Sequence, residues 1–177
     1  MMGKFLAGML VVIAVLSGGA IYYLQVYAFY EDVPANGIDD VVLVSQADNA
    51  AKPIEYENFL AIDASSSPIR YRACFTTGLT AETASETYVG IEDAAPRIAP
   101  PWFDCFDAEA LGAELESGTA KVFLGVKNVA YGVDRIVAIT SDGRGYSWHE
   151  LNDCGEKSYD GTVIGEECPE RPQAPTN

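Results

Sequence analysis

The sequence predicts an α+β fold in which an N-terminal transmembrane helix precedes a small, mainly antiparallel β-sheet domain with one or two short helices and two disulfides. Three observations predict this fold. Residues 5–30 form a run of 26 residues without a charged side chain. Several later segments alternate apolar and polar residues with the two-residue period of a half-buried strand. All four cysteines lie beyond the apolar run.

The apolar run is long enough to cross a bilayer. A hydrocarbon core of about 30 Å needs roughly 20 residues in a helix, and residues 5–24 alone supply them. Lys4 precedes the run, whereas the first charged residues after it are acidic, beginning with Glu31. The positive-inside rule then predicts a cytoplasmic N-terminus. We expect a single-pass membrane protein with residues 31–177 outside the cytoplasm.

A cleaved signal peptide is the alternative interpretation of this run. Gly18-Gly19-Ala20 has the small side chains of a signal-peptidase site. The uncharged run is longer than the apolar core of a signal peptide, however, which favours a retained anchor over residues 1–30.

Small residues fall on one stripe of the predicted helix. Their spacing of four or seven residues would let another transmembrane helix approach closely. Glycine and alanine are also common in membrane helices in general, so the stripe permits a partner helix without requiring one. The residues of this helix-packing stripe are Gly3, Ala7, Ala14 and Gly18.

The part of the chain after the anchor is strongly acidic. It carries 26 acidic and 10 basic residues, a net charge of −16. Nucleic acid and anionic lipid headgroups are repelled by such a surface, except at a local basic patch. A basic soluble partner would be attracted, although a negative surface also simply keeps a small domain soluble.

The cysteines predict two disulfides in an oxidising compartment. Four cysteines allow three pairings. We favour Cys154 with Cys168, across a short glycine-containing turn, and Cys74 with Cys105. Because no two cysteines have the C-x-x-C spacing, a zinc ribbon or a thioredoxin-like redox pair is not indicated.

Taken in order, the chain reads as a tether, one domain over residues 40–168 and a flexible tail over residues 169–177. Pro34 and Gly37 mark the tether, residues 31–39. Strands are predicted from β-branched residues and two-residue alternation. They are residues 40–45, 55–64, 69–75, 88–91, 120–126, 133–140 and 146–151.

Two short helices interrupt the strands. Thr80 is placed to cap one, and Asp107 to cap a second that Gly118 ends. Between them, residues 95–106 contain three prolines and three large aromatic side chains and therefore predict an irregular, core-covering loop.

One cluster of residues suggests chemistry. Ser147, His149 and Glu150 lie together in the segment GYSWHE. In a strand, Ser147 and His149 share one face whereas Glu150 points to the other, so a nucleophile–base–acid relay has poor geometry. A hydrolase using Ser147 and His149 therefore ranks last among our hypotheses.

The sequence contains no signature for a metal or cofactor. It has one histidine, and its cysteines are assigned to disulfides. No calcium-binding loop, phosphate-binding GxxxxGK or dinucleotide-binding GxGxxG is present. We therefore assign no cofactor, metal or catalytic residue.

Five segments along nearly the whole chain carry a family resemblance: YYLQVYAFYE (22–31), SPIRYRACF (67–75), PPWFDCFDAEALGAELESG (100–118), YGVDRIVA (131–138) and DGRGYSWHELNDCGE (142–156). Together they resemble a family of small uncharacterised bacterial membrane-anchored proteins that contain a domain of unknown function. Members are sometimes labelled histidine kinases, but this chain has neither glycine-rich ATP-binding motifs nor a cytoplasmic domain to hold them. The resemblance implies the architecture and no catalytic residue.

We expect a non-catalytic accessory or interaction subunit of a larger inner-membrane complex. Its partners would be transmembrane helices of that complex. A respiratory complex is a specific hypothesis, because an acidic domain suits sites visited by a basic electron carrier such as cytochrome c. The alternative is a periplasmic envelope-assembly factor or ligand-binding module. Its pocket would be lined by Tyr71, Phe75, Trp102, Phe103 and Trp148.

Overall fold

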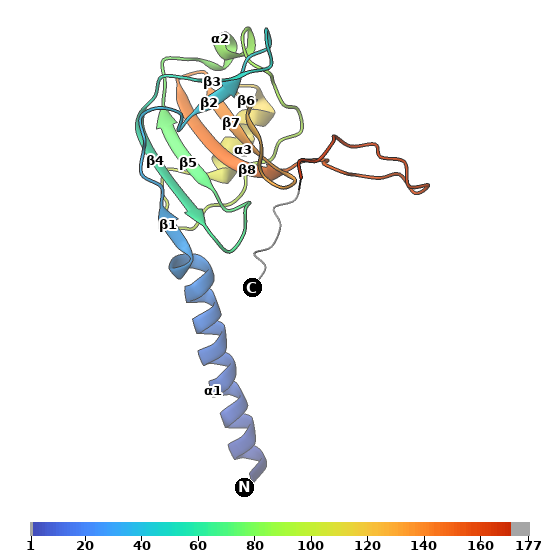
Figure 1. Cartoon of the computed structure of the whole chain (residues 1–177). Coiled ribbons are helices and arrows are strands. Elements are labelled where there is room, and N and C mark those ends of the chain that lie inside the picture. The colour runs from blue at the N-terminus through green and yellow to red at the C-terminus, as the bar shows by residue number, and fades with distance from the viewer. Residues whose placement is uncertain (1, 171–177) are drawn as a thin grey trace.

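A long N-terminal helix leads directly into a β-sheet domain, as Figure 1 shows. The computed structural model describes residues 2–170. Helix α1 (Met2–Tyr23) continues into a π-helical turn, η1 (Leu24–Ala28). Residues 2–28 are apolar enough and long enough to cross a membrane, and none of the helix is buried by the domain. The predicted fold class is confirmed.

The domain is built on one six-stranded antiparallel sheet with the order β1-β4-β5-β8-β7-β6. A second sheet pairs two short strands, β2 and β3. The strands are β1 (Tyr30–Asp32), β2 (Val42–Val44), β3 (Ala51–Pro53), β4 (Glu57–Ala64), β5 (Arg72–Thr76), β6 (Ala120–Ala130), β7 (Val133–Thr140) and β8 (Arg144–Leu151).

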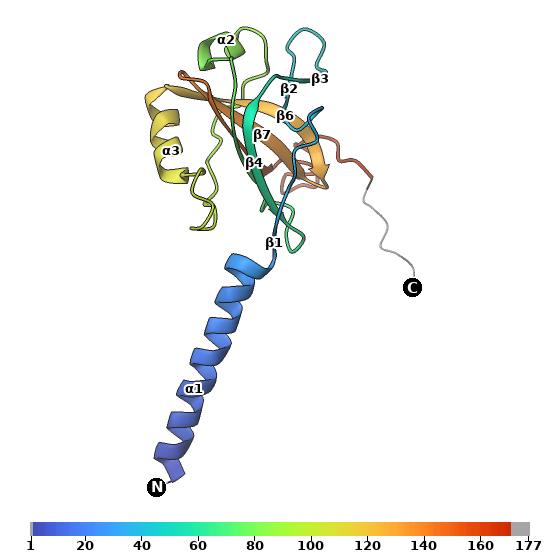
Figure 2. The same cartoon turned by 90° about the vertical axis from the view of Figure 1, so that its left-hand side faces the viewer.

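Both faces of the large sheet are covered. Ile136 and Ala138 of β7 belong to the cluster that holds Trp148 and Leu111 of helix α3 (Ala108–Ser117). Val137 and Ile139 belong to the cluster that holds Leu43 of β2 and Phe75 of β5. Figure 2 shows α3 and the small sheet on opposite sides of the large one. Because both faces are buried, β7 is apolar throughout most of its length rather than strictly alternating.

The predicted helix ends are confirmed. Thr80 accepts a hydrogen bond from the Thr83 amide in a reciprocal capping box at the start of helix α2 (Ala81–Ser85). Asp107 accepts from two amides at the start of α3, and Gly118 ends that helix in the left-handed conformation that glycine adopts without strain.

Both predicted disulfides are present, Cys74–Cys105 and Cys154–Cys168. The second closes the base of an arm, dark orange to red in Figure 1, that extends away from the sheet. Most of the predicted flexible tail, residues 171–177, lies outside the described residues.

Three segments differ from the sequence expectation. The predicted tether starts with strand β1, and Val33 then donates to the Ala61 carbonyl, so the chain joins the sheet as soon as it leaves the helix. Residues 88–91 form isolated bridges to Ser45 and Phe123 instead of a full strand. Strand β3 forms between the predicted strands at residues 40–45 and 55–64, where no strand was expected, because main-chain pairing with β2 suffices there without an apolar pattern.

Two glycines provide a stability test of this packing. A Cβ atom at Gly145 would lie about 2.1 Å from the Phe75 ring, which is buried. Gly145→Ala should therefore lower the free energy of unfolding by about 1–3 kcal/mol. Gly112→Ala, in an uncrowded position of α3, should raise it by up to about 1 kcal/mol. Thermal unfolding of the detergent-solubilised chain measures both, and equal effects would contradict the packing described.

Candidate functional site at the helix–domain junction

The residues singled out for chemistry are structural. Ser147 is buried, and its hydroxyl donates to the Ile136 carbonyl at 2.9 Å. His149 is also buried, whereas Glu150 lies on the other face and approaches Arg97 at 3.6 Å. The three side chains do not meet, in agreement with the poor relay geometry expected from the strand.

His149 lies in a buried stack. Its ring stacks on Tyr71 with 4.7 Å between centroids, and the Arg135 guanidinium lies 4.1 Å from the centroid of the Tyr71 ring. Arg135 Nε donates to His149 Nε2 at 3.1 Å, so Nδ1 carries the proton that is donated to the Pro68 carbonyl. Burial, with the nearby Arg135 charge, lowers the pKa of His149 to about 4, and the imidazole is neutral at pH 7.

The aromatic side chains proposed for a ligand pocket do not gather around one cavity. Trp148, Phe75 and Tyr71 are buried, each in a different apolar cluster. Trp102 and Phe103 instead lie next to one another in the loop over residues 95–106.

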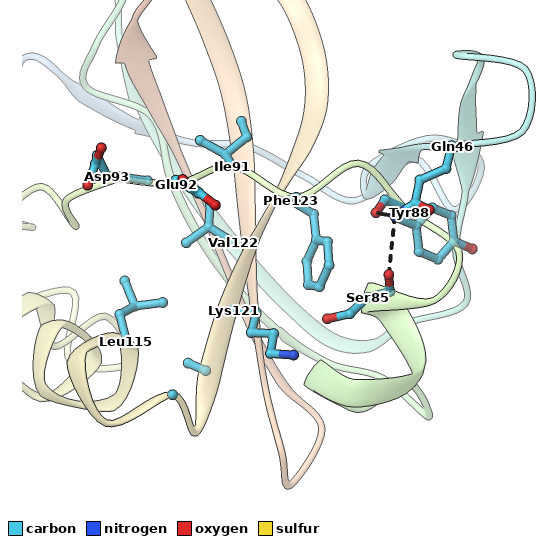
Figure 3. Close-up of a pocket in the computed structure, with 14 residues that line it drawn as sticks. Gln46, Ser85, Tyr88, Ile91, Glu92, Asp93, Leu115, Lys121, Val122 and Phe123 are labelled. Carbon is cyan, nitrogen blue, oxygen red and sulfur yellow. Dashed lines mark hydrogen bonds between the residues drawn. The ribbon is translucent and has the colours of Figure 1, made fainter.

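The groove shown in Figure 3 has a volume of about 630 Å³ and lies between β6, α3 and the segment around Tyr88. The Gln46 amide is committed to the Ser85 and Tyr88 carbonyls. Lys121 lies apart from Glu92 and Asp93 in the same view. Within residues 2–170, no group of three or more His, Cys, Asp or Glu side chains could hold a metal ion.

A cluster of side-chain hydrogen bonds and ring contacts joins the end of the helix to the domain. Trp102 Nε1 donates to the Val26 carbonyl of η1 at 2.7 Å. Arg70 donates to the Gln25 carbonyl at 3.0 Å and also to the Gln25 side-chain oxygen. The Tyr30 ring packs edge-on against Trp102, with centroids 5.8 Å apart, and lies beneath the Arg70 guanidinium.

The backbone has no flexible linker at this junction. Phe29 alone separates η1 from β1, and β1 pairs with β4 in the register Tyr30 to Ala64. The end of the helix is therefore fixed both by main-chain pairing and by side chains that come from two other parts of the sequence.

Arg72 holds the loop that carries Trp102. Its guanidinium donates to the carbonyls of Arg97 (2.9 Å) and Ile98 (3.1 Å) in the loop, and to those of Ile69 and Tyr71 beside β5. The side chain is 4% exposed. Burial lowers its pKa to about 10, so it stays charged at pH 7. The sequence predicted a strand over residues 69–75, which includes Arg72, but no sequence pattern indicated these contacts.

The predicted helix-packing residues remain unpartnered by the domain. Gly3, Ala7, Ala14 and Gly18 all lie on the exposed surface of α1, and a Cβ atom at Gly3 or Gly18 would meet nothing within 4 Å. The stripe is therefore open along the part of the helix that the structure describes.

Fold and junction together define a small, disulfide-stabilised antiparallel domain fused without a flexible linker to a helix able to span a membrane. The chain belongs to a family of unknown function, DUF6446, whose model matches residues 41–169. The matched region begins beyond the helix and β1. Neither a curated protein nor a solved structure matches the chain.

Trp102→Phe should loosen the end of the helix. The change keeps an aromatic ring beside Tyr30 but removes the N–H that bonds the Val26 carbonyl. Loss of one such bond costs about 1 kcal/mol, or a factor of about 5 in the local opening equilibrium. Amide hydrogen exchange over residues 24–32 should accelerate by that factor. Tyr159→Phe, at a fully exposed position of the arm, is the control and should change nothing there.

His149 predicts a specific pH dependence of stability. Because its pKa is about 4 when folded and 6.5 ordinarily, the unfolded chain binds the proton more readily between these values. His149 therefore contributes stability that is complete above pH 6.5 and is lost as the pH falls towards 4, by about 3 kcal/mol at most. His149→Gln should show a shallower loss in thermal unfolding over this window. An unchanged slope would contradict the buried neutral imidazole.

Proposed function

We propose that this protein is a single-pass subunit of the bacterial inner membrane that works without catalysis, by docking to a larger membrane complex. In this proposal the N-terminus is cytoplasmic and residues 31–177 lie in the periplasm. Support for the topology comes from Lys4 before the apolar run, from the acidic residues after it and from the two disulfides, which suit an oxidising compartment.

The observation that carries the proposal is the braced junction, by which we mean the end of the helix held to the domain by Trp102 and Arg70. A domain that merely has to stay near a membrane needs only a flexible linker. Here the chain passes from helix to sheet through one residue, and Trp102 and Arg70 fix the last helical turn. Ordering these groups costs conformational entropy. A fixed junction orients the whole domain relative to the face of the helix, and this is useful when that face docks on a partner.

The open stripe on α1 is the face that we assign to partner helices. Small side chains allow close backbone approach, and packing supplies most of the attraction between helices in lipid. The acidic domain, with a net charge of −16 after residue 30, would then sit beside the partner's periplasmic surface. In a respiratory complex this charge would attract a basic electron carrier.

Affinity purification in mild detergent tests the proposal. The tagged full chain should co-purify with subunits of a respiratory complex, identified by mass spectrometry and by haem absorbance. Ala14→Leu adds bulk to the stripe and should lower this recovery at least fivefold. Ala20→Leu makes the same change about 120° around the helix and should leave recovery unchanged.

Three outcomes would each contradict a part of the proposal. Recovery of the protein alone would remove the complex, and recovery with other membrane subunits but no haem would remove its respiratory identity. Equal recovery with Ala14→Leu and Ala20→Leu would show that the stripe is not the docking face.

A further inference from the structure

A basic cavity lies beside the braced junction. It has a volume of about 480 Å³, with one wall formed by Gln25 and Val26 at the end of the helix and the opposite wall by the loop over residues 95–106. Within the described chain, every charged residue in its lining is an arginine, namely Arg70, Arg72 and Arg97. A cationic cavity is unexpected in a domain whose net charge is −16.

The positive charge of the cavity is poorly compensated. Among the described ion pairs, the three arginines make one, between Arg97 and Glu150 at 3.6 Å. Arg72 satisfies its donors with main-chain carbonyls, which supply no countercharge. Arg97 Nε is buried and has no hydrogen-bond partner within the described chain. An anion in the cavity would provide the missing countercharge.

The rim of the cavity is apolar. Ile98 is 84% exposed, and the adjoining prolines also line the cavity. On the helix side, Tyr22, Tyr23 and Tyr27 are exposed within one turn of Gln25. Such rings favour the headgroup region of a bilayer. In the proposed membrane placement, the cavity therefore opens at headgroup depth, with the exposed Ile98 in its lining.

We propose that this cavity binds the phosphodiester of an anionic phospholipid in the leaflet that faces the domain. Guanidinium groups of Arg70 and Arg97 would donate to the phosphate oxygens, a pairing that suits the planar geometry of arginine. Arg72 supplies charge and holds the loop wall in place. The inference rests on the membrane placement proposed above but requires no partner complex.

Native mass spectrometry of the detergent-solubilised full chain tests this inference. The chain is offered equal amounts of phosphatidylglycerol and phosphatidylcholine with identical acyl chains. Phosphatidylglycerol should be retained preferentially, and the double variant Arg70→Gln/Arg97→Gln should lower its retention at least fivefold. The matched control Lys121→Gln/Lys127→Gln removes the same two charges from β6 and should behave as wild type.

A second pair of variants separates charge from packing at the junction. Gln25→Ala removes the side-chain partner of Arg70 and leaves all three arginines, so lipid retention should persist. Arg97→Gln alone removes the long ion pair between Arg97 and Glu150, at 3.6 Å. This variant should therefore fold normally and still lose retention of the lipid. Thermal unfolding of each variant is measured in parallel.

Three results would overturn the inference. The first is equal retention of phosphatidylglycerol and phosphatidylcholine. The second is equal retention of phosphatidylglycerol by the double variant and its control. The third is a loss of lipid retention in Gln25→Ala as large as that in Arg97→Gln. Displacement of the lipid by the same concentration of inorganic phosphate would instead assign the cavity to a free anion. The lipid experiment uses the purified chain without a partner subunit. Failure to retain phosphatidylglycerol would therefore leave the proposed docking intact, and failure of the co-purification would leave the lipid site intact.

Discussion

The attachment of one proline-rich loop to strand β5 is the constraint on which the rest of the structure depends. Prolines 96, 100 and 101 cannot donate main-chain hydrogen bonds, so residues 95–106 cannot join the sheet through a regular ladder. The loop is held instead by the Cys74–Cys105 disulfide and by the buried guanidinium of Arg72. Arg72 and Cys74, two residues apart on β5, thus supply the charged contact and the covalent contact that hold the loop.

This attachment positions the groups on which both proposals rest. The loop presents Trp102 to the Val26 carbonyl, and the neighbouring Arg70 reaches Gln25, so the helix meets the domain at a fixed point. The same loop wall and the same arginines create the basic cavity. The proposed docking by the helix and the proposed binding of a lipid phosphate would therefore both depend on this one arrangement. Neither proposal draws on Ser147 or His149, whose side chains are committed to the core.

Local patterns in the sequence were sufficient for much of the fold. Strand β7 and the caps Thr80, Asp107 and Gly118 depend on near neighbours, so they could be predicted. Strand β1 could not, because its residues were assigned to the end of the anchor and the start of the tether, and they gain their structure only by pairing with β4. The junction and cavity were missed for the same reason. Their hydrogen bonds join residues 45 and 76 positions apart, and no local pattern records such contacts.

The central claim is that helix and domain behave as one body. The most direct measurement is the rotational correlation time of the domain's backbone amides, from ¹⁵N relaxation of the full chain in lipid nanodiscs. A braced junction predicts that amides in β5, β7 and β8 share the slow correlation time of the embedded helix. A domain that tumbles several times faster than the nanodisc, as on a flexible linker, would contradict the account.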